Sequence, residues 1–245
     1  MNVKKITALF LTMVFSLTAR SQVIISLLFG DKLNSEKISF GLLVGNGWNN
    51  LTGYKTSSWG SNFNLGLYLS FKMSDRIFLQ FDAMAKYKLG AKKLPVYSLH
   101  DEALDSLFAT GTVERDIKYL SLATTFQYRF YKYFNLEIGP QISLRIKATD
   151  IFSVSRSAGD LKFEKKINDA TTLFDIGAAG GVSYQFAKGN GVKIAFRYYY
   201  GFVDVMLGDP GNNANRSLQL NGYIPIGRGK ALAKKNKTES KTNTN

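Results

Sequence analysis

The chain of 245 residues contains no cysteine, only one histidine and, after its first 21 residues, no apolar run long enough for a transmembrane helix. The absence of cysteine excludes disulfide bonds and a lipid anchor attached to a cysteine at a cleavage site. The single histidine, His100, leaves no credible Ser/His/Asp triad, so we predict that the protein is not an enzyme. Without disulfides, an exported chain must be stabilised by a large core or by closure of a sheet.

The first residues have the composition of a secretory signal peptide. Lys4 and Lys5 supply the positive start, and the apolar stretch 6–17 follows. Ala19 and Ser21 are small residues at the positions that a signal peptidase recognises. A membrane anchor is the alternative, but about a dozen apolar residues are too few to span a bilayer. We therefore predict export by the general secretory pathway.

Apolar and polar residues alternate through the body of the chain. In residues 63–72, Phe63 and Leu65 fall on one side, whereas Asn64 and Gly66 fall on the other. A period of two predicts β-strands with one apolar face. The pattern is found in the segments 38–45, 63–72, 77–87, 119–130, 134–147, 172–186, 192–201 and 217–226.

Strand length and connection length favour a membrane barrel over a soluble sandwich. Several segments exceed the about 5–6 residues usual in globular sheets, and about ten tilted residues cross a bilayer. Short connections alternate with long ones, at 73–75, 131–133 and 187–191 against 46–61, 90–116, 148–171 and 202–216. Outer-membrane barrels have short periplasmic turns and long extracellular loops. We therefore predict an all-β fold, an eight-stranded antiparallel up-and-down transmembrane β-barrel in the cell outer membrane.

In such a barrel the apolar faces contact lipid and the polar faces line the lumen. We expect the tyrosines, many of which lie near strand ends, to form aromatic girdles at the membrane surfaces. The candidates for a lumen charge network are Asp82, Lys86, Arg129, Glu137, Arg145, Lys147, Asp175, Lys193 and Arg197. A turn at 131–133 would place Arg129 opposite Glu137 as an ion pair.

Charges inside a barrel must be paired or hydrated. An eight-stranded barrel is filled by its own side chains, so a structural plug is the first interpretation of these residues. A narrow path for protons or ions is the alternative.

The formal charge of +14 is spread along the chain rather than gathered on one stripe. This distribution argues against nucleic acid as a partner. Residues 228–245 are strongly basic, and they could be a solvated tail or could be attracted to an anionic membrane surface. We expect outer-membrane lipid and lipopolysaccharide as partners, together with other outer-membrane or periplasmic proteins.

Residues 100–108 combine potential metal ligands with helical spacing. The ligand types are those of His100, Asp101, Glu102 and Asp105. They match no known ligand spacing, so a short amphipathic helix in an outer loop is the preferred interpretation. We predict neither a metal nor a cofactor.

Two other stretches have simple alternatives to ligand binding. Residues 208–215, which include Asp209, could bind calcium or could form an ordinary turn. Residues 177–181 read Gly-Ala-Ala-Gly-Gly but lack the Lys-Ser/Thr of a phosphate-binding loop. We expect these small residues to make room for a large neighbour such as Arg197 or Tyr199.

Three segments after the predicted signal peptide resemble a known family: residues 26–53, SLLFGDKLNSEKISFGLLVGNGWNNLTG, and the later stretches YLSLATTFQYRF and FDIGAAGGVSYQF. The family is that of the PorT-like outer-membrane β-barrel proteins of Gram-negative bacteria. Residues 26–53 carry the most specific part, and the two later stretches resemble the middle strands of that family. The resemblance implies a single barrel of about eight strands. One branch of the family is associated with protein secretion and gliding machinery. Such barrels usually finish on an aromatic residue, and this sequence departs from that pattern, so we expect a recognition signal that is internal or non-standard.

These inferences predict four parts. They are a signal peptide (1–21), an amphipathic segment (22–37), the outer-membrane β-barrel (38–227) and a disordered basic polar tail (228–245). The predicted function is a non-enzymatic structural or accessory component of an outer-membrane assembly, such as a protein-secretion machine. A narrow channel and a barrel with loop-borne ligand binding or adhesion are the alternatives.

Overall fold

The computed structural model describes residues 34–226 except 36, 158, 190 and 209–210. The predicted signal peptide, the basic tail and most of the amphipathic segment lie outside the described residues, as does Asp209 of the candidate calcium loop. The chain separates into a unit spanning Gly41–Ile224 and a second unit made of the stretches on either side. Within the described residues, no helix has both the length and the apolar character needed to cross a membrane.

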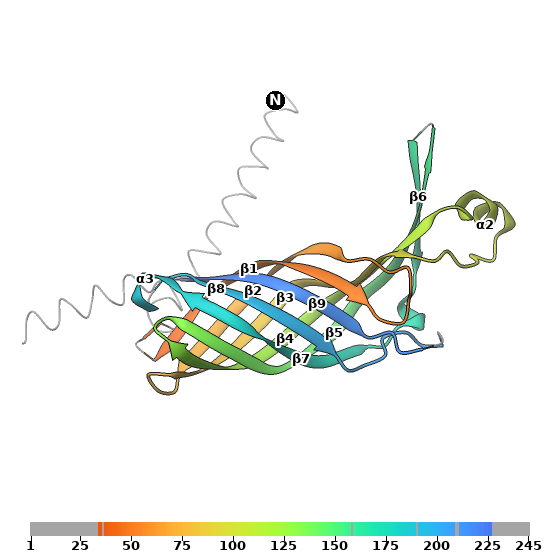
Figure 1. The fold of residues 1–245 in the computed structure, drawn as a ribbon. Helices are drawn as coiled ribbons and strands as arrows, with labels where there is room; N and C mark the ends of the chain where they lie inside the picture. Colours follow the sequence, from red (N-terminus) through yellow and green to blue (C-terminus); the bar gives the residue numbers. More distant parts are fainter. Residues whose placement is uncertain (1–33, 36, 158, 190, 209–210, 227–245) are drawn as a thin grey trace, which may run out of the picture. The chain divides into compact units, whose positions relative to one another are not determined.

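The unit Gly41–Ile224 is built from antiparallel strands that close into a ring (Figure 1). The strands are β1 (Ile38–Leu51), β2 (Gly60–Lys72), β3 (Ile77–Leu94), β4 (Thr112–Tyr131), β5 (Phe134–Arg156), β6 (Gly159–Lys166), β7 (Phe174–Gln185), β8 (Lys193–Gly201) and β9 (Asn215–Pro225). The order around the ring is β4-β3-β2-β1-β9-β8-β7-β5, and pairing of β4 with β5 closes it. The predicted eight-stranded antiparallel β-barrel is confirmed. β6 was not predicted, and it extends the sheet beyond the ring by pairing with β5.

Short helical segments lie in three of the connections: α2 (Glu102–Phe108), the 3-10 turn η1 (Asn168–Ala170) and α3 (Phe186–Gly189). The connections 73–76, 132–133 and 186–192 lie at one end of the ring, which we call the short-turn end. The connections at the other end, the long-loop end, include 52–59 and 95–111, and β6 lies there between β5 and β7. The predicted alternation of short and long connections is thus confirmed.

The apolar faces of the strands point outward from the ring. The side chains of Phe63 and Leu67 are 47% and 41% exposed, whereas Asn64 between them is fully buried in the lumen. A sandwich would have buried the leucines, so the arrangement is that of a barrel whose outer wall is apolar.

The expectation that the tyrosines form aromatic girdles is wrong for several of them. Tyr128 and Tyr200 are exposed on the outer wall, as predicted. Five others are buried inside the barrel and fill it: Tyr68, Tyr87, Tyr119, Tyr199 and Tyr223. Their parity along the strands, rather than their nearness to strand ends, decides on which face they lie.

Gly177 shows how the small residues of β7 are used. A Cβ atom at this position would lie 2.7 Å from the ring of Tyr199, which is itself completely buried. The expectation that residues 177–181 make room for a large neighbour is therefore confirmed.

The second unit contributes few described residues. The backbone amide of Phe40 donates to the side-chain oxygen of Asn34 at 2.9 Å, and the amide of Ile226 donates to the carbonyl of Phe40 at 3.0 Å. The last residues described near the two chain ends are therefore hydrogen-bonded to each other within this unit.

Candidate functional site

A group of four charged residues occupies the lumen, and we call it the charge quartet: Asp82, Glu137, Lys193 and Arg197. Arg197 lies at its centre and is only 1% exposed. Its Nη1 atom lies 2.5 Å from Oδ2 of Asp82, and its Nε atom lies 2.5 Å from Oε1 of Glu137. The three side chains come from β8, β3 and β5, so the ion pairs connect strands that are distant in sequence.

Lys193 and neutral side chains complete the quartet. The Nζ atom of Lys193 donates to the amide oxygens of Gln80 and Gln127, in the second case at 3.1 Å, and lies 4.4 Å from the ring centroid of Tyr223. The hydroxyl of Tyr223 donates to Asp82 at 2.9 Å. With two cations and two carboxylates, the quartet is formally neutral, which is how a buried set of charges is tolerated.

Three other predicted lumen residues face inward but stand apart from the quartet. Arg129 lies half-exposed at the short-turn end, with long contacts of 3.4 and 3.5 Å to side-chain oxygens of Asn135 and Gln185. The Nε atom of Arg145 donates to the carbonyl of Thr172 at 3.1 Å. Asp175 is fully buried and accepts a hydrogen bond of 2.8 Å from the side chain of Asn215. The predicted set is thus divided between one central cluster and isolated positions.

The assignment of Lys86 and Lys147 to the lumen is wrong. One extra residue in β3 between Met84 and Tyr87 shifts the register against β4, and Lys86 lies outside, over the ring of Phe63. One extra residue in β5 has the same effect, because Lys147 pairs with the exposed Lys118. A β-bulge changes the face on which every later residue of a strand lies.

The predicted ion pair between Arg129 and Glu137 is also wrong. Glu137 lies opposite Gln127, and Arg129 lies opposite Asn135, so the register differs by two residues from the prediction. The physical reason is the tighter connection, in which only residues 132–133 lie between the strands. Glu137 binds Arg197 instead.

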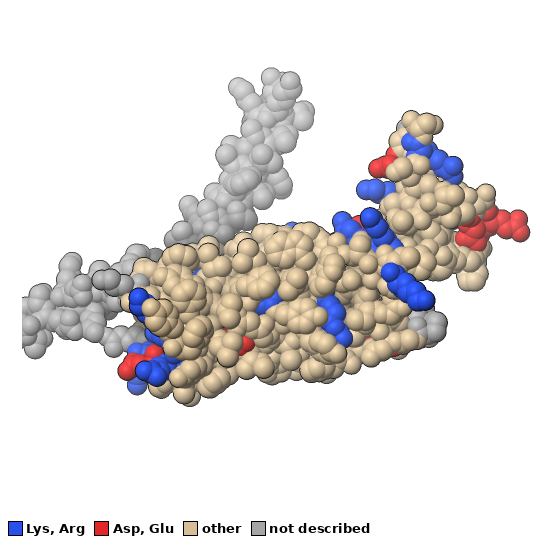
Figure 2. All heavy atoms as spheres, viewed as in Figure 1, with Lys and Arg blue, Asp and Glu red and all other residues tan. Residues whose placement is uncertain are grey.

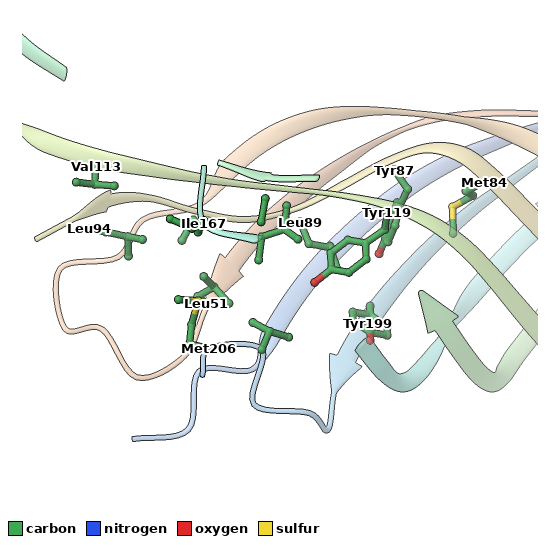
Figure 3. Close-up of a cluster of buried hydrophobic side chains, with 14 of the residues drawn as sticks. Leu51, Met84, Tyr87, Leu89, Leu94, Val113, Tyr119, Ile167, Tyr199 and Met206 are labelled. Carbon is green, nitrogen blue, oxygen red and sulfur yellow. The ribbon is translucent and has the colours of Figure 1, made fainter. Parts of the chain in front are cut away.

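Above the polar lumen, an apolar layer closes the long-loop end (Figure 3). It contains the buried side chains Leu51, Leu94, Val113, Ile167 and Met206, which come from strands and from the loops after them. Figure 3 shows them gathered beyond Tyr87 and Tyr119. The lumen is thus filled by charges in the middle and by apolar side chains at this end, as expected for eight strands.

Beyond this layer a folded element extends from the ring, and we call it the projection: residues 95–111 with α2, and the β5–β6 hairpin at 149–166 (Figure 1). Its aromatic side chains pack together in an aromatic core that is continuous with the apolar layer. The ring of Phe152 lies 5.1 Å from that of Tyr97, 6.1 Å from that of Phe108 and 6.4 Å from that of Phe163. In addition, Arg156 of the hairpin donates to the carbonyl of Leu107 at 3.0 Å.

The acidic residues near α2 stabilise the loop. Asp101 caps the helix by accepting hydrogen bonds of 3.0 Å from the amides of Ala103 and Leu104. Asp105 accepts from the Ser98 hydroxyl and from the Leu99 amide, both at 2.6 Å. These bonds, the Ser98 hydroxyl first, lower the pKa of the Asp105 carboxyl. The predicted short amphipathic helix is confirmed, and no group of potential metal ligands occurs within residues 34–226 as described.

A cavity of about 440 Å³ lies where the projection meets the long-loop end. Its walls combine apolar and aromatic side chains with basic ones: Tyr54, Leu94, Pro95, Val96, Tyr97, Arg115, Lys165, Lys166, Ile167, Ala170 and Met206, besides Gly53 and Asp169. Arg115 forms an ion pair with Asp150, with Nη2 at 2.6 Å and Nε at 2.8 Å, and Nη1 donates to the Tyr54 hydroxyl at 2.8 Å. The volume is in the range of small-molecule sites.

The prediction from sequence missed the pair Arg115–Asp150, because it assigned 90–116 and 148–171 to loops. The alternation of Val113, Arg115 and Ile117 was the available signal, and β4 does begin at Thr112. The flanking charged residues on the opposite face obscured it.

The family described as outer membrane protein beta-barrel domain matches residues 29–206. No curated protein matches the chain.

Among solved structures, the chain is similar to Ail, the attachment invasion locus protein of Yersinia pestis, with 12% identity over 78% of this chain and 99% of that chain, and a TM-score of 0.41. It is also similar to the Neisserial surface protein A, with 12% identity, 77% and 99% coverage, and a TM-score of 0.40. OprG from Pseudomonas aeruginosa is similar with 14% identity over 77% of this chain and 91% of that chain, and a TM-score of 0.33. At these identities the conclusion rests on the family match, which spans more than half of the chain. The chain belongs to the outer membrane protein β-barrel domain family and resides in the outer membrane.

Proposed function

We propose that the protein is a non-enzymatic, non-conducting barrel that acts as an accessory component of an outer-membrane assembly by presenting the projection to a partner protein. The observation that carries the proposal is the aromatic core around Phe152, which holds α2 and the hairpin together outside the barrel. A connection that only joins two strands needs no such aromatic packing, whereas an ordered surface lowers the entropic cost of binding. The resemblance to PorT-like proteins supports protein secretion as the kind of assembly.

The surface of the projection suits a reversible contact. One face of β6 carries Phe163 toward the aromatic core, and the other face is fully charged, with Asp160, Lys162, Glu164 and Lys166 in alternation. Figure 2 shows acidic side chains gathered near α2 and basic ones on the hairpin. Such a mixed-charge surface favours a charge-complementary protein rather than a purely apolar one.

The filled lumen supports the non-conducting part of the proposal. The charge quartet occupies the middle of the barrel, and the apolar layer around Leu51 and Met206 closes the long-loop end. Passage of an ion would require both to rearrange.

Site-specific photo-crosslinking in living cells tests the docking role. A photoreactive amino acid in place of Lys162 should give a discrete crosslinked product, because this side chain points away from the aromatic core. The matched controls are Lys132 in a short turn and Leu122 on the outer wall, at which we expect no product of the same mass. A product of equal intensity at Lys132, or none at Lys162, would refute docking through the projection.

The cavity beside the projection favours a second candidate function, binding of a small molecule at the loops. Its aromatic and apolar walls with lysines at the edge suit an apolar carboxylate. In nanodiscs, calorimetric titration with 2-naphthoate should show binding that Val96→Trp weakens at least tenfold by filling the cavity. Leu161→Trp, on the exposed hairpin, is the control and should leave binding unchanged. Equal affinities of the two variants would exclude this site.

A further inference from the structure

Three lysines lie side by side on the outer wall of the barrel, and we call them the lysine row: Lys88 on β3, Lys118 on β4 and Lys147 on β5. The ladder pairs Lys88 with Lys118 and Lys118 with Lys147. Directly paired residues of neighbouring strands project from the same face of a sheet, so the three side chains are immediate neighbours. The bulges in β3 and β5 create this arrangement, since without them Lys88 and Lys147 would face the lumen.

The charge of the row is only partly balanced. Lys88 forms an ion pair of 2.6 Å with Asp116. Lys118 and Lys147 form no ion pair with any residue in the part of the chain that the structure describes. Like charges directly opposite each other in a sheet are destabilising. A repulsive pair that is built by a bulge, at the expense of ladder regularity, points to an anion between the two ammonium groups.

The position of the lysine row along the barrel wall indicates what its side chains contact. On its short-turn side follow Leu120, Leu144 and Ile146, which are exposed and apolar and therefore face lipid. On its long-loop side follow Glu114 and Asp116, whose partly exposed carboxylates bind Lys92 and Lys88. The row thus marks the boundary between the hydrocarbon region and water. Lysine stems can lie along the apolar wall while the ammonium groups reach the headgroups.

We propose that Lys118 and Lys147 bind the phosphate of a phosphorylated lipid headgroup in the outer leaflet. A phosphate carries enough negative charge to compensate two ammonium groups at once, and lysine binds it as a point charge without strict geometry. A carboxylate of a neighbouring protein is excluded from this position wherever lipid covers the wall. The site is independent of the docking role of the projection.

The test compares two double variants of equal charge in nanodiscs. One is Lys118→Gln/Lys147→Gln, and the control is Lys132→Gln/Lys162→Gln, which removes two lysines that are not neighbours. Urea unfolding is followed in phosphatidylcholine alone and with added bis-phosphorylated lipid A. We expect lipid A to raise the unfolding midpoint of the native protein and of the control. In the row variant the rise should fall to less than a fifth.

The stability of the row variant without lipid A provides a second test. In phosphatidylcholine alone, the row variant should be at least as stable as the native protein, because the repulsion is removed. A row variant that is destabilised equally with and without lipid A would overturn the proposal. So would an equal rise produced by dephosphorylated lipid A, or by inorganic phosphate at the same concentration, because either result would remove the lipid phosphate as the ligand.

Discussion

We expect Arg197→Met to destabilise the barrel by about 3–5 kcal/mol, the usual cost of removing one partner from a buried ion pair. Methionine fills much of the same volume, so the loss is electrostatic. The carboxylates of Asp82 and Glu137, at most 1% exposed, would remain in the lumen with Lys193 as the remaining cation of the quartet. Urea unfolding in lipid, followed by the gel mobility of the folded form, measures the change.

Two comparisons separate this explanation from general damage to the lumen. Adding Glu137→Gln to Arg197→Met should recover a large part of the lost stability, because Asp82 and Lys193 then remain as one carboxylate and one cation. Arg129→Met should cost far less, since Arg129 is half-exposed and its side-chain hydrogen bonds are long. In double-mutant cycles, Arg197 and Glu137 should be coupled, whereas Arg129 and Glu137 should be additive. Coupling only in the second cycle would show that the register is wrong.

We expect Ile138→Arg to cost about 2–4 kcal/mol when the barrel is folded in a bilayer, because an arginine would be placed against hydrocarbon. Ile138 is 62% exposed on β5, opposite Phe126, and lies between other exposed apolar residues of this strand. On the surface of a soluble protein the same change would have almost no effect, within about 0.5 kcal/mol. Reversible unfolding from liposomes measures the difference.

The control for this substitution is Ser155→Arg, an exposed position on the same strand within the projection. It should leave the free energy of unfolding unchanged, because the projection is surrounded by water. If both variants behave alike, the outer wall of β5 does not contact lipid at Ile138.

The period of two predicted the strands, and strand length and connection length together predicted the barrel and hence the lipid-facing side of residues such as Leu65 and Leu67. The period of two failed where a strand contains an extra residue. Lys86 and Lys147 would face the lumen if the alternation continued unbroken, but each follows a bulge, and the prediction extended the alternation across it. The members of the quartet precede the bulges or lie on strands without one, and for this reason Asp82, Glu137 and Arg197 were placed correctly on the inner face.

The extended parts of β4 and β5 were missed for a different reason. Outside the membrane both faces of a strand can be polar or charged, so residues such as Glu114 and Asp116 look like loop residues. The ion-pair partner of a charged residue is likewise determined by the three-dimensional fold. Nothing in the sequence near Glu137 indicates that Arg197, sixty positions away, is its partner.

The length of β5, 23 residues from Phe134 to Arg156, has a mechanical consequence. The same strand runs from the short turn through the membrane and into the hairpin, so the projection is joined to the wall without a flexible hinge. A force that pulls the hairpin along this strand is shared in shear by the many hydrogen bonds to β4 and β7, which must break together. A force across the hairpin would instead open the β5–β6 ladder one pair at a time. The projection therefore resists a force along β5 strongly and a force across the hairpin weakly. A force applied to it from outside the cell is transmitted directly to the barrel.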